Sequence, residues 1–275
     1  MAWPKIKNII ILILLATNLC LTGFTINRQT QAAQLEKQPR AEAIAFLQER
    51  NIWIQEDIVP DAVVLKSMQV TRDKEREAVL AQSLLGENVS VESRGAEVYR
   101  YFNENGFIQF HSNGEFSARF YGNGYLARGS IEVHSHQMLE RIEFFGELVR
   151  KQTDGMKTVL TYQEFWEDAS LFNCQVQVNY EAGMMVSMTG GRRLAGIPEE
   201  SAQQEQITAA TALMRFYNGV KALGDTCTQV KEIIQGYIIT STITESTPMT
   251  PVWQIVTDTC TYQLDMLTGQ LSRVQ

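Results

Sequence analysis

The first pattern along the chain is an uncharged apolar run from Ile9 to Ile26, preceded by Lys5 and Lys7. A helix rises ~1.5 Å per residue and the hydrocarbon core of a bilayer is ~30 Å thick, so this run is long enough to cross a membrane once. The two lysines favour a cytoplasmic N-terminus with the remainder exported. We therefore predict a single-pass bacterial cell-membrane protein with a cytoplasmic stub and anchor in residues 1–27, whose residues 9–26 contact the lipid bilayer.

A cleaved secretory signal is the alternative interpretation of this run, because Thr30-Gln31-Ala32 resembles a loose small-x-small cleavage site. The run is longer than the roughly 7 to 15 apolar residues usual in signal peptides, which favours an uncleaved anchor. Lipid attachment at Cys20 fits less well. A bacterial lipobox has a small residue directly before its cysteine and an apolar one two positions further back, where this chain has Leu19 and Thr17. In each case the bulk of the chain is extracytoplasmic.

Beyond the anchor, stretches with a helical period of 3.6 residues alternate with stretches of period 2. Residues 28–40 are polar and broken at Pro39, as in a stalk, and residues 41–50 have the apolar face of a helix. Further helices are predicted over 73–85, ending at Gly86, around 137–148, and over 205–223 with Ser201 as N-cap. Strands are predicted at 52–58, 62–70, 98–102, 107–110, 116–120, 158–162, 174–180, 184–189, 230–244, 252–257, 260–264 and 270–274.

The connections between the strands predict an antiparallel meander. Asn105-Gly106 and Asn113-Gly114 favour hairpin turns, since both residue types tolerate positive φ. The glycine-containing Tyr121 to Tyr125 is interpreted as another hairpin turn, because no phosphate-binding helix follows it. The fold class is therefore α+β, with helix-plus-meander units in tandem. We expect a juxtamembrane stalk and helix at 28–51 and extracytoplasmic domains at 52–133 and 134–275.

Composition supports folded domains and excludes some partners. The 275 residues are 44% hydrophobic and 20% charged, which is enough to build a core. The chain carries 31 acidic against 24 basic residues, and two of the basic ones precede the anchor. This acidic excess disfavours nucleic acid, anionic lipid headgroups and wall polyanions as partners.

Candidate metal and nucleophile residues are sparse. On a strand, His134 and His136 would point the same way and share a metal, but only Glu132 and Glu140 lie nearby as further ligands. Exposed polar residues at a strand end are the alternative. His111-Ser112 cannot act as a nucleophile pair on a strand, because adjacent residues face opposite sides. No catalytic, metal or cofactor site is therefore assigned.

Two pairs of charged residues have both a functional and an ordinary interpretation. Arg192 and Arg193 follow two glycines and are suited either to an anion or partner carboxylate or to a solvated turn, and the turn is favoured. Asp258 and Asp265 have the residue type of an acid/base pair. Turn chemistry explains both more simply, since Asp readily hydrogen-bonds the backbone in turns.

Three cysteines, Cys174, Cys227 and Cys260, fall in the exported part, where disulfides form. An odd number in a large domain argues against a cystine scaffold and favours small buried hydrophobic side chains. One disulfide with one leftover thiol stays open.

Two segments carry a resemblance to a known family. The opening MAWPKIKNIIILILLATNLCLTGF is similar to the start of the YycI branch of the YycH/YycI regulatory family, in which a Trp- and Lys-containing stub runs into a single span. The end PVWQIVTDTCTYQLDMLTGQLSRV resembles the end of the same family and PepSY-like modules. At this end the resemblance is carried by Trp253, Tyr262, Asp265, Thr268 and Gly269.

The resemblance implies a non-enzymatic, membrane-anchored accessory regulator of a two-component system of the cell envelope. Its partners would be a WalK/YycG-type sensor histidine kinase and a YycH-like protein, and it would have no cofactor. The exported cysteines depart from the family pattern. Two other functions stay open, a PepSY-type inhibitor or chaperone of an extracellular peptidase, and a sensor whose sheet clefts, lined by Tyr99, Tyr101, Phe110 or Trp166, hold a small ligand.

Within the predicted span, polar residues mark a face for a partner helix. Asn18, Thr22 and Thr25 share one helical face, which Leu15 and Ile11 continue. In lipid, polar and small side chains supply the adhesion between helices, because apolar surface provides no drive to associate. The alternative is that Asn18 is merely tolerated near the outer boundary of the bilayer.

Overall fold

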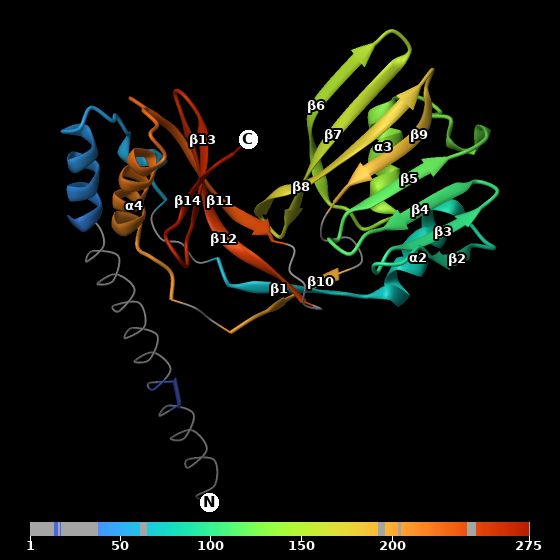
Figure 1. Ribbon diagram of the computed structural model, residues 1–275, viewed down its shortest axis with the longest axis horizontal. Coiled ribbons are helices and arrows are strands. Elements are labelled where there is room, and N and C mark those ends of the chain that lie inside the picture. Colours follow the sequence, from blue (N-terminus) through green and yellow to red (C-terminus); the bar gives the residue numbers. More distant parts are fainter. Residues whose placement is uncertain are drawn as a thin grey trace, which may run out of the picture.

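The computed structural model describes residues 14, 15, 17, 38–60, 65–191, 196–202, 205–240 and 246–274. These residues form a mixed α+β fold in which strands predominate (Figure 1). The helical elements are residues 38–48, η1 (Glu56–Ile58), α2 (Lys74–Leu85), η2 (Asn123–Tyr125), α3 (Ile131–Glu140) and α4 (Ala209–Ala222). The strands are β1 (Met68–Arg72), β2 (Ser90–Ser93), β3 (Tyr99–Asn103), β4 (Gly106–Phe110), β5 (Phe116–Phe120), β6 (Gly146–Asp154), β7 (Lys157–Trp166), β8 (Ala169–Glu181), β9 (Met184–Gly190), β10 (Gly196–Glu200), β11 (Val230–Ile239), β12 (Ser246–Thr257), β13 (Thr261–Asp265) and β14 (Leu271–Arg273).

The long strand β8 joins the two halves of the sheet. It pairs with β7 over most of its length, while β9 and β11 share its other edge. The contact with β11 is parallel and short, with Gly236 beside Ser170 and Tyr237 beside Leu171. One half of the sheet continues from β9 through β5, β4 and β3 to β2, and the other from β11 through β12 to β1 and β13.

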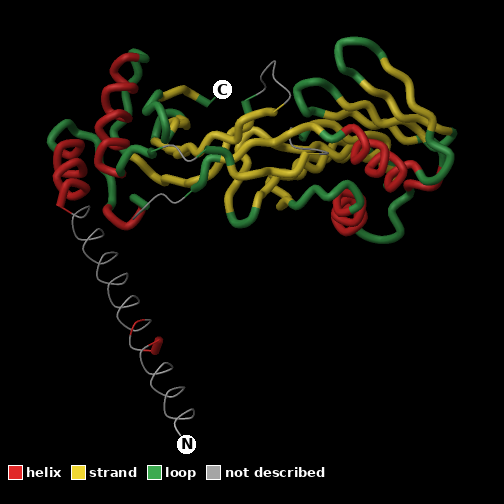
Figure 2. The backbone as a smooth tube through the Cα atoms, turned by 90° about the horizontal axis from the view of Figure 1, so that it is seen from below, coloured by secondary structure: helices red, strands yellow, loops and turns green. Residues whose placement is uncertain are grey.

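The half built from β2–β5 and β7–β9 has its own core. Helices α2 and α3 lie on the same side of these strands (Figure 2). Leu80 and Leu84 of α2 and Leu139 of α3 pack with Ile108, Phe110 and other apolar residues of the sheet. At roughly 1.5–3 kcal/mol for each large apolar side chain removed from water, this cluster is a main source of stability in that half.

A second core lies at the other end of the molecule, between α4, the helix of residues 38–48 and strands β11–β13 (Figures 1 and 2). It contains Leu47, Phe216 and Trp253, each completely buried. A smaller third cluster, which includes Leu171 of β8 and Tyr237 of β11, lies where the halves meet. The described part of the chain thus passes from the second core, at residues 43–59, through the first core and back to the second at residues 209–266.

Several predicted elements are confirmed because their signals are local. Helix α2 follows Asp73, whose carboxylate accepts hydrogen bonds from the amides of Glu75 (2.9 Å) and Arg76 (3.1 Å), and it stops at Gly86 with φ 88°. Strands β3, β4 and β5 form the predicted meander, with Asn103 paired to Gly106 across the first turn. The helix predicted over 41–50 is present over residues 38–48.

The helix predicted around 137–148 is wrong in position. Helix α3 begins after Ser130, whose hydroxyl accepts from the amide of Glu132 (3.2 Å), and it is over before Glu143, which has φ 55°. Leu148 therefore lies on β6, an edge strand that pairs only with β7 among the described strands. The apolar residues of β6 are exposed, so its sequence lacks the alternation of a half-buried strand and can continue a helical pattern.

Four further predictions need correction. Ser201 follows strand β10, and the cap of α4 is Thr208, whose hydroxyl oxygen accepts from the amide of Thr211 (3.3 Å). The segment 52–58 makes one strand-like bridge, at Trp53, before η1. Residues 121–125 are no hairpin but contain η2, where the Tyr125 hydroxyl donates to the carbonyl of Leu84 (3.0 Å). Strand β12 begins at Ser246, six residues before the prediction.

The predicted membrane span, residues 9–26, lies almost entirely outside the residues that the structure describes, which include only 14, 15 and 17 of it. Among those described, no helix is both long and apolar enough to cross a bilayer. The proposed domain boundaries stay predictions. Residues 43–59 share the second core with residues 209–266, and the first core takes residues from both sides of position 133.

Candidate functional site

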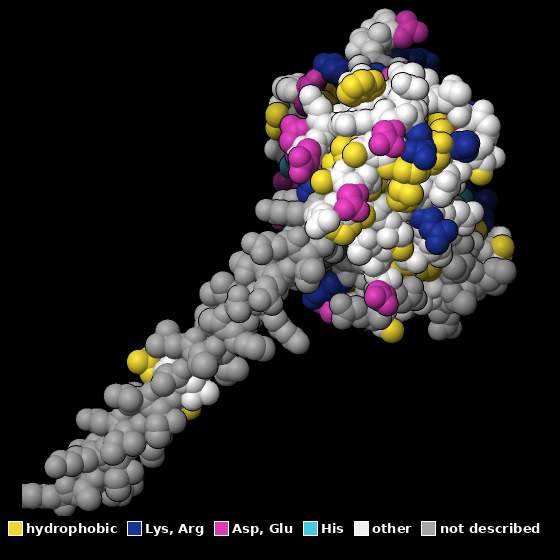
Figure 3. Space-filling view, turned by 90° about the vertical axis from the view of Figure 1, so that its left-hand side faces the viewer, with side chains coloured by type: hydrophobic (Ala, Val, Ile, Leu, Met, Phe, Trp, Pro, Cys, Tyr) yellow, Lys and Arg dark blue, Asp and Glu magenta, His cyan; other side chains and the backbone are white. Residues whose placement is uncertain are grey.

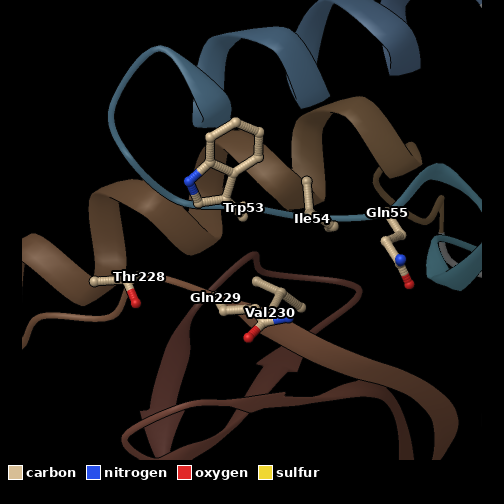
Figure 4. A pocket seen from close by; sticks show the side chains of 6 residues that line it. All are labelled: Trp53, Ile54, Gln55, Thr228, Gln229 and Val230. Atoms are coloured by element: carbon tan, nitrogen blue, oxygen red, sulfur yellow. The ribbon is translucent and has the colours of Figure 1, made fainter.

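A groove with a volume of about 380 Å³ opens between two strand-like segments near the end of the second core (Figure 4). We call it the Trp53 groove. One wall is residues 53–55, which follow the helix of residues 38–48. The other is residues 228–230, which lead into β11. The residues that line it are Trp53, Ile54, Gln55, Thr228, Gln229 and Val230.

The first wall is positioned by the end of the helix of residues 38–48. Asn51 adopts a left-handed conformation with φ 61°, which Asn tolerates better than most residues, and the amide of Ile52 donates to the carbonyl of Leu47 (3.0 Å). The amide of Trp53 then donates to the carbonyl of Thr228 (2.8 Å), and its carbonyl accepts from the amide of Val230 (2.9 Å). The backbone of Trp53 is thus fixed while its indole is 63% exposed.

The second wall is held by Asp258, in the turn between β12 and β13. Its carboxylate accepts from the amide (3.0 Å) and hydroxyl (2.6 Å) of Thr228 and from the amide of Gln229 (3.2 Å). These hydrogen bonds, chiefly those from Thr228, hold the pKa of Asp258 below its usual range. The amide of Asp258 donates in turn to the carbonyl of Gln229 (3.0 Å). The wall is therefore fixed to the turn it packs against.

The turn interpretation is confirmed for Asp265, whereas the carboxylate of Asp258, itself in a turn, binds a segment 29 and 30 residues earlier in the chain. The Asp265 carboxylate accepts from the amides of Leu267 (2.7 Å) and Thr268 (2.9 Å), within its own turn. The Asp265 carboxylate thus binds its own loop, as short polar side chains in turns commonly do, and the Asp258 carboxylate binds another loop. They do not form an acid/base pair.

Aromatic and cationic side chains pack together between the helix of residues 38–48 and α4. The rings of Phe46 and Tyr217 meet edge to face, with centroids 5.3 Å apart. The guanidinium carbon of Arg50 lies 3.4 Å from the centroid of Phe46, and the Lys221 ammonium lies 5.3 Å from that of Tyr217. Arg50 is three residues from Trp53, within ~11 Å along the chain. Figure 3 looks onto this end of the molecule, where hydrophobic side chains lie exposed among charged ones.

The chemistry that this arrangement offers is contact rather than reaction. None of the six lining side chains is titratable, so the groove itself supplies apolar surface and neutral hydrogen-bonding groups. Exposed Trp, Tyr and Arg side chains are the residue types that dominate the energy of protein–protein interfaces. The groove and its surroundings therefore have the composition of a protein contact surface.

The predicted partner-helix face lies almost entirely outside the described residues. Ile11, Asn18, Thr22 and Thr25 are not among them, and Leu15 is described as helical and 61% exposed. Arg192 and Arg193 are also outside the description. The hypotheses on these residues stay predictions.

The strand assumed for the two histidines is wrong, because both lie on α3. His134 Nδ1 is 2.7 Å from the hydroxyl of Tyr180, and burial followed by the charge of Arg141 lowers the pKa of His134. His136 lies beside Glu140, with 3.3 Å between Nδ1 and the carboxylate. The part of the chain that the structure describes contains no group of three or more His, Cys, Asp or Glu side chains arranged to hold a metal.

The four aromatic residues predicted to line a ligand cleft do not do so together. Tyr101 and Phe110 are buried in the first core, with ring centroids 5.9 Å apart, and Tyr99 packs against that core. Trp166 packs instead against the third cluster. These aromatic side chains therefore serve the interior of the fold.

Comparisons with known proteins give no family. No protein-family model and no curated protein matches the chain. A crystal structure of an uncharacterized protein from Eubacterium rectale ATCC 33656 is 12% identical, with 77% of this chain and 86% of that one covered and a TM-score of 0.46. The Bacillus megaterium YpeB C-terminal domain is 10% identical, with coverages of 74% and 99% and a TM-score of 0.38. Neither likeness is close enough to decide the family or the function.

The Trp53 groove could not be predicted from the sequence, for an identifiable reason. The pattern over residues 52–58 predicts a strand, and nothing local shows whether the indole of Trp53 is covered. Its exposure depends on Thr228 and Val230, which pair with its backbone from about 175 residues further along the chain. The one available signal was a Trp in a short extended segment bounded by polar residues.

Proposed function

We propose that this chain is a membrane-tethered extracytoplasmic protein that acts by binding a partner protein rather than by catalysis. In its finer form, the proposal is that of an accessory regulator of a sensor histidine kinase in the cell envelope, acting with a YycH-like protein through its span and its exported tandem PepSY-like units. The finer form rests on the two sequence segments described above. The tether rests on the uncharged apolar run that follows Lys5 and Lys7.

The observation that supports binding is the Trp53 groove. A Trp that is 63% exposed on a backbone held by two hydrogen bonds presents a large rigid apolar surface at low entropic cost. Arg50, three residues before Trp53, stacks on Phe46 and adds a positive charge close to it in the chain. Interfaces place such aromatic anchors at their centre and charged residues around them.

The test replaces Trp53 by Ala in the full chain and measures copurification of the sensor kinase from membranes. Losing a central aromatic anchor costs ~2 kcal/mol or more, which corresponds to about a 30-fold loss of affinity. We expect the kinase to be lost from the copurified material and kinase output to change in the same cells. Because the indole is largely exposed, the melting temperature of the variant should stay near that of the wild type.

Met156→Ala is the matched control, since Met156 is 77% exposed in the turn between β6 and β7, in the other half of the molecule. It should leave copurification unchanged. Kinase binding that survives Trp53→Ala at wild-type level would contradict the role of the groove. Specific recovery of an extracellular peptidase in place of the kinase would replace the regulator proposal by the peptidase-inhibitor alternative.

A further inference from the structure

Two of the described cysteines lie against the same core. Cys227 is in the loop between α4 and β11, and Cys260 is at the end of the turn between β12 and β13. Cys227 is a buried member of the second core cluster, and Cys260 packs against that cluster from a half-buried position. Both are free thiols.

Hydrogen bonds bring the two loops together on both sides of the cysteines. The hydroxyl of Thr259, next to Cys260, donates to the carbonyl of Thr226, next to Cys227 (2.9 Å). On one flank the amide of Thr228 donates to the carboxylate of Asp258 (3.0 Å). On the other, the hydroxyl of Tyr262 donates to the carboxylate of Asp225 (3.1 Å).

Three hydrogen bonds between the loops therefore surround the two thiols, each one or two residues from a cysteine. They join residue 225 to 262, 226 to 259 and 228 to 258. A disulfide needs Cα atoms about 4.4–6.8 Å apart. The two cysteines are near enough for the charge of Cys260 to contribute to raising the pKa of Cys227.

We propose that Cys227 and Cys260 form an intramolecular disulfide, which ties the second wall of the Trp53 groove to the β12–β13 turn. The bond closes between the two Sγ atoms without moving α4 or the hairpin, because the flanking hydrogen bonds already hold the loops. Thr228 directly follows Cys227, so the cross-link sets the rigidity of the groove wall. This inference rests on the loop geometry and goes beyond the proposed function.

The oxidant for this reaction is a small-molecule or protein disulfide. The half-buried Cys260 thiolate attacks one sulfur of the oxidant, forms a mixed disulfide and releases the first thiol. The Cys227 thiolate then attacks Cys260 Sγ, and the second oxidant thiol leaves with the electron pair of the broken bond. Two protein thiols are oxidised and one oxidant disulfide is reduced to two thiols.

The second step has a predictable pH dependence. Burial, followed by the charges of Asp258 and Asp225, raises the pKa of Cys227 to about 11. Because the thiolate is the nucleophile, ring closure should accelerate about tenfold per pH unit below that pKa.

Cys174 provides the internal control. It is completely buried in the third cluster, on β8, away from the two loops. It should keep its free thiol under the conditions that oxidise the other two. The experiment uses the purified full chain carrying Cys20→Ser, so that only the three described thiols remain.

The reduced protein is incubated with oxidised glutathione at pH 8.5, quenched with N-ethylmaleimide, digested with trypsin without reduction and analysed by mass spectrometry. The two cysteines fall in separate tryptic peptides, residues 222–231 and 232–273. We expect these peptides to be linked in the parent protein and in Cys174→Ser. The link should be absent in Cys227→Ser and in Cys260→Ser, and oxidation should raise the melting temperature only where the link forms.

The proposal is overturned if both cysteines are recovered as maleimide or glutathione adducts in the folded parent protein. It is equally overturned if the link appears only after unfolding in urea, or if Cys174 is the partner in the link. The parent protein alone gives these outcomes, so failure of a serine variant to fold does not remove the test. None of the outcomes depends on whether a kinase binds at the groove.

Discussion

Arg72 and Glu77 form an ion pair between β1 and α2 whose loss should destabilise the protein strongly. The Glu77 side chain is 2% exposed and accepts from the Arg72 guanidinium at 2.5 and 3.1 Å. Arg72 also donates to the carbonyl of Glu97 (2.6 Å). Removing one partner of a buried pair leaves an unpaired charge and costs ~3–5 kcal/mol. We therefore expect Arg72→Met to lower the free energy of unfolding at pH 7 by about that amount.

The loss should depend on pH in a defined direction. Burial raises the pKa of Glu77 above its ordinary 4.5, against the opposing effect of Arg72. Because the pKa is raised in the folded state, protonation favours folding, and this contribution is lost as the pH rises through the folded-state pKa. Without Arg72, the pKa of Glu77 in the folded state rises further, because the guanidinium no longer stabilises the carboxylate. The destabilisation by Arg72→Met should therefore be largest at pH 7 and much smaller at pH 4.

Urea unfolding of the full chain at pH 7 and pH 4, followed by circular dichroism, measures both quantities. The control is the double variant Arg72→Met/Glu77→Leu, which removes both charges and should recover most of the lost stability, because an apolar pair can replace a buried ion pair. A loss for Arg72→Met of less than ~1 kcal/mol at pH 7, or an equal loss at both pH values, would refute the reasoning.

Two further predictions concern other parts of the fold. Gly236→Ala should lower the free energy of unfolding by ~1–3 kcal/mol, because its Cβ would lie 2.4 Å from the carbonyl oxygen of Ser170. Thermal melts measure this loss, and Gly124→Ala, whose Cβ would meet open space, should be nearly neutral in them. The pKa of His134 is lowered in the folded state, so its protonation favours the unfolded chain. The protein should therefore lose stability as the pH falls from about 6.5 through the pKa of His134 in the folded state. His134→Gln should remove this part of the pH dependence, and an unchanged pH profile of the melting temperature would contradict it.

Elements with short-range signals were predictable from the sequence. Helix α2 has its cap at Asp73 and its stop at Gly86, and the hairpin between β3 and β4 has Asn105-Gly106 at its turn. Asp265 was correctly expected to bond the backbone of its own turn, since short carboxylate side chains in turns usually do so. In each case the deciding contacts join residues close in sequence, or follow from residue type alone.

The features that were missed depend on distant partners. The strand at Leu148 and Val149 is an exception, because β6 pairs with the next strand, β7, across the two-residue turn of Gly155 and Met156. The start of α4 depends on β10, which pairs with β1 through residues 196–200 and so keeps Ser201 out of the helix. The exposure of Trp53 likewise follows from its pairing with residues 228–230. Local propensity cannot report such pairings, because they join segments far apart in the chain.

The central claim is that a partner protein docks at the Trp53 groove. Photo-crosslinking from a benzophenone amino acid at position 53 of the membrane-borne full chain tests it most directly, with the same probe at position 156 as the control. We expect a specific adduct between position 53 and a histidine kinase, and none from position 156. A probe at position 53 that yields no protein adduct, or the same adducts as position 156, would contradict it.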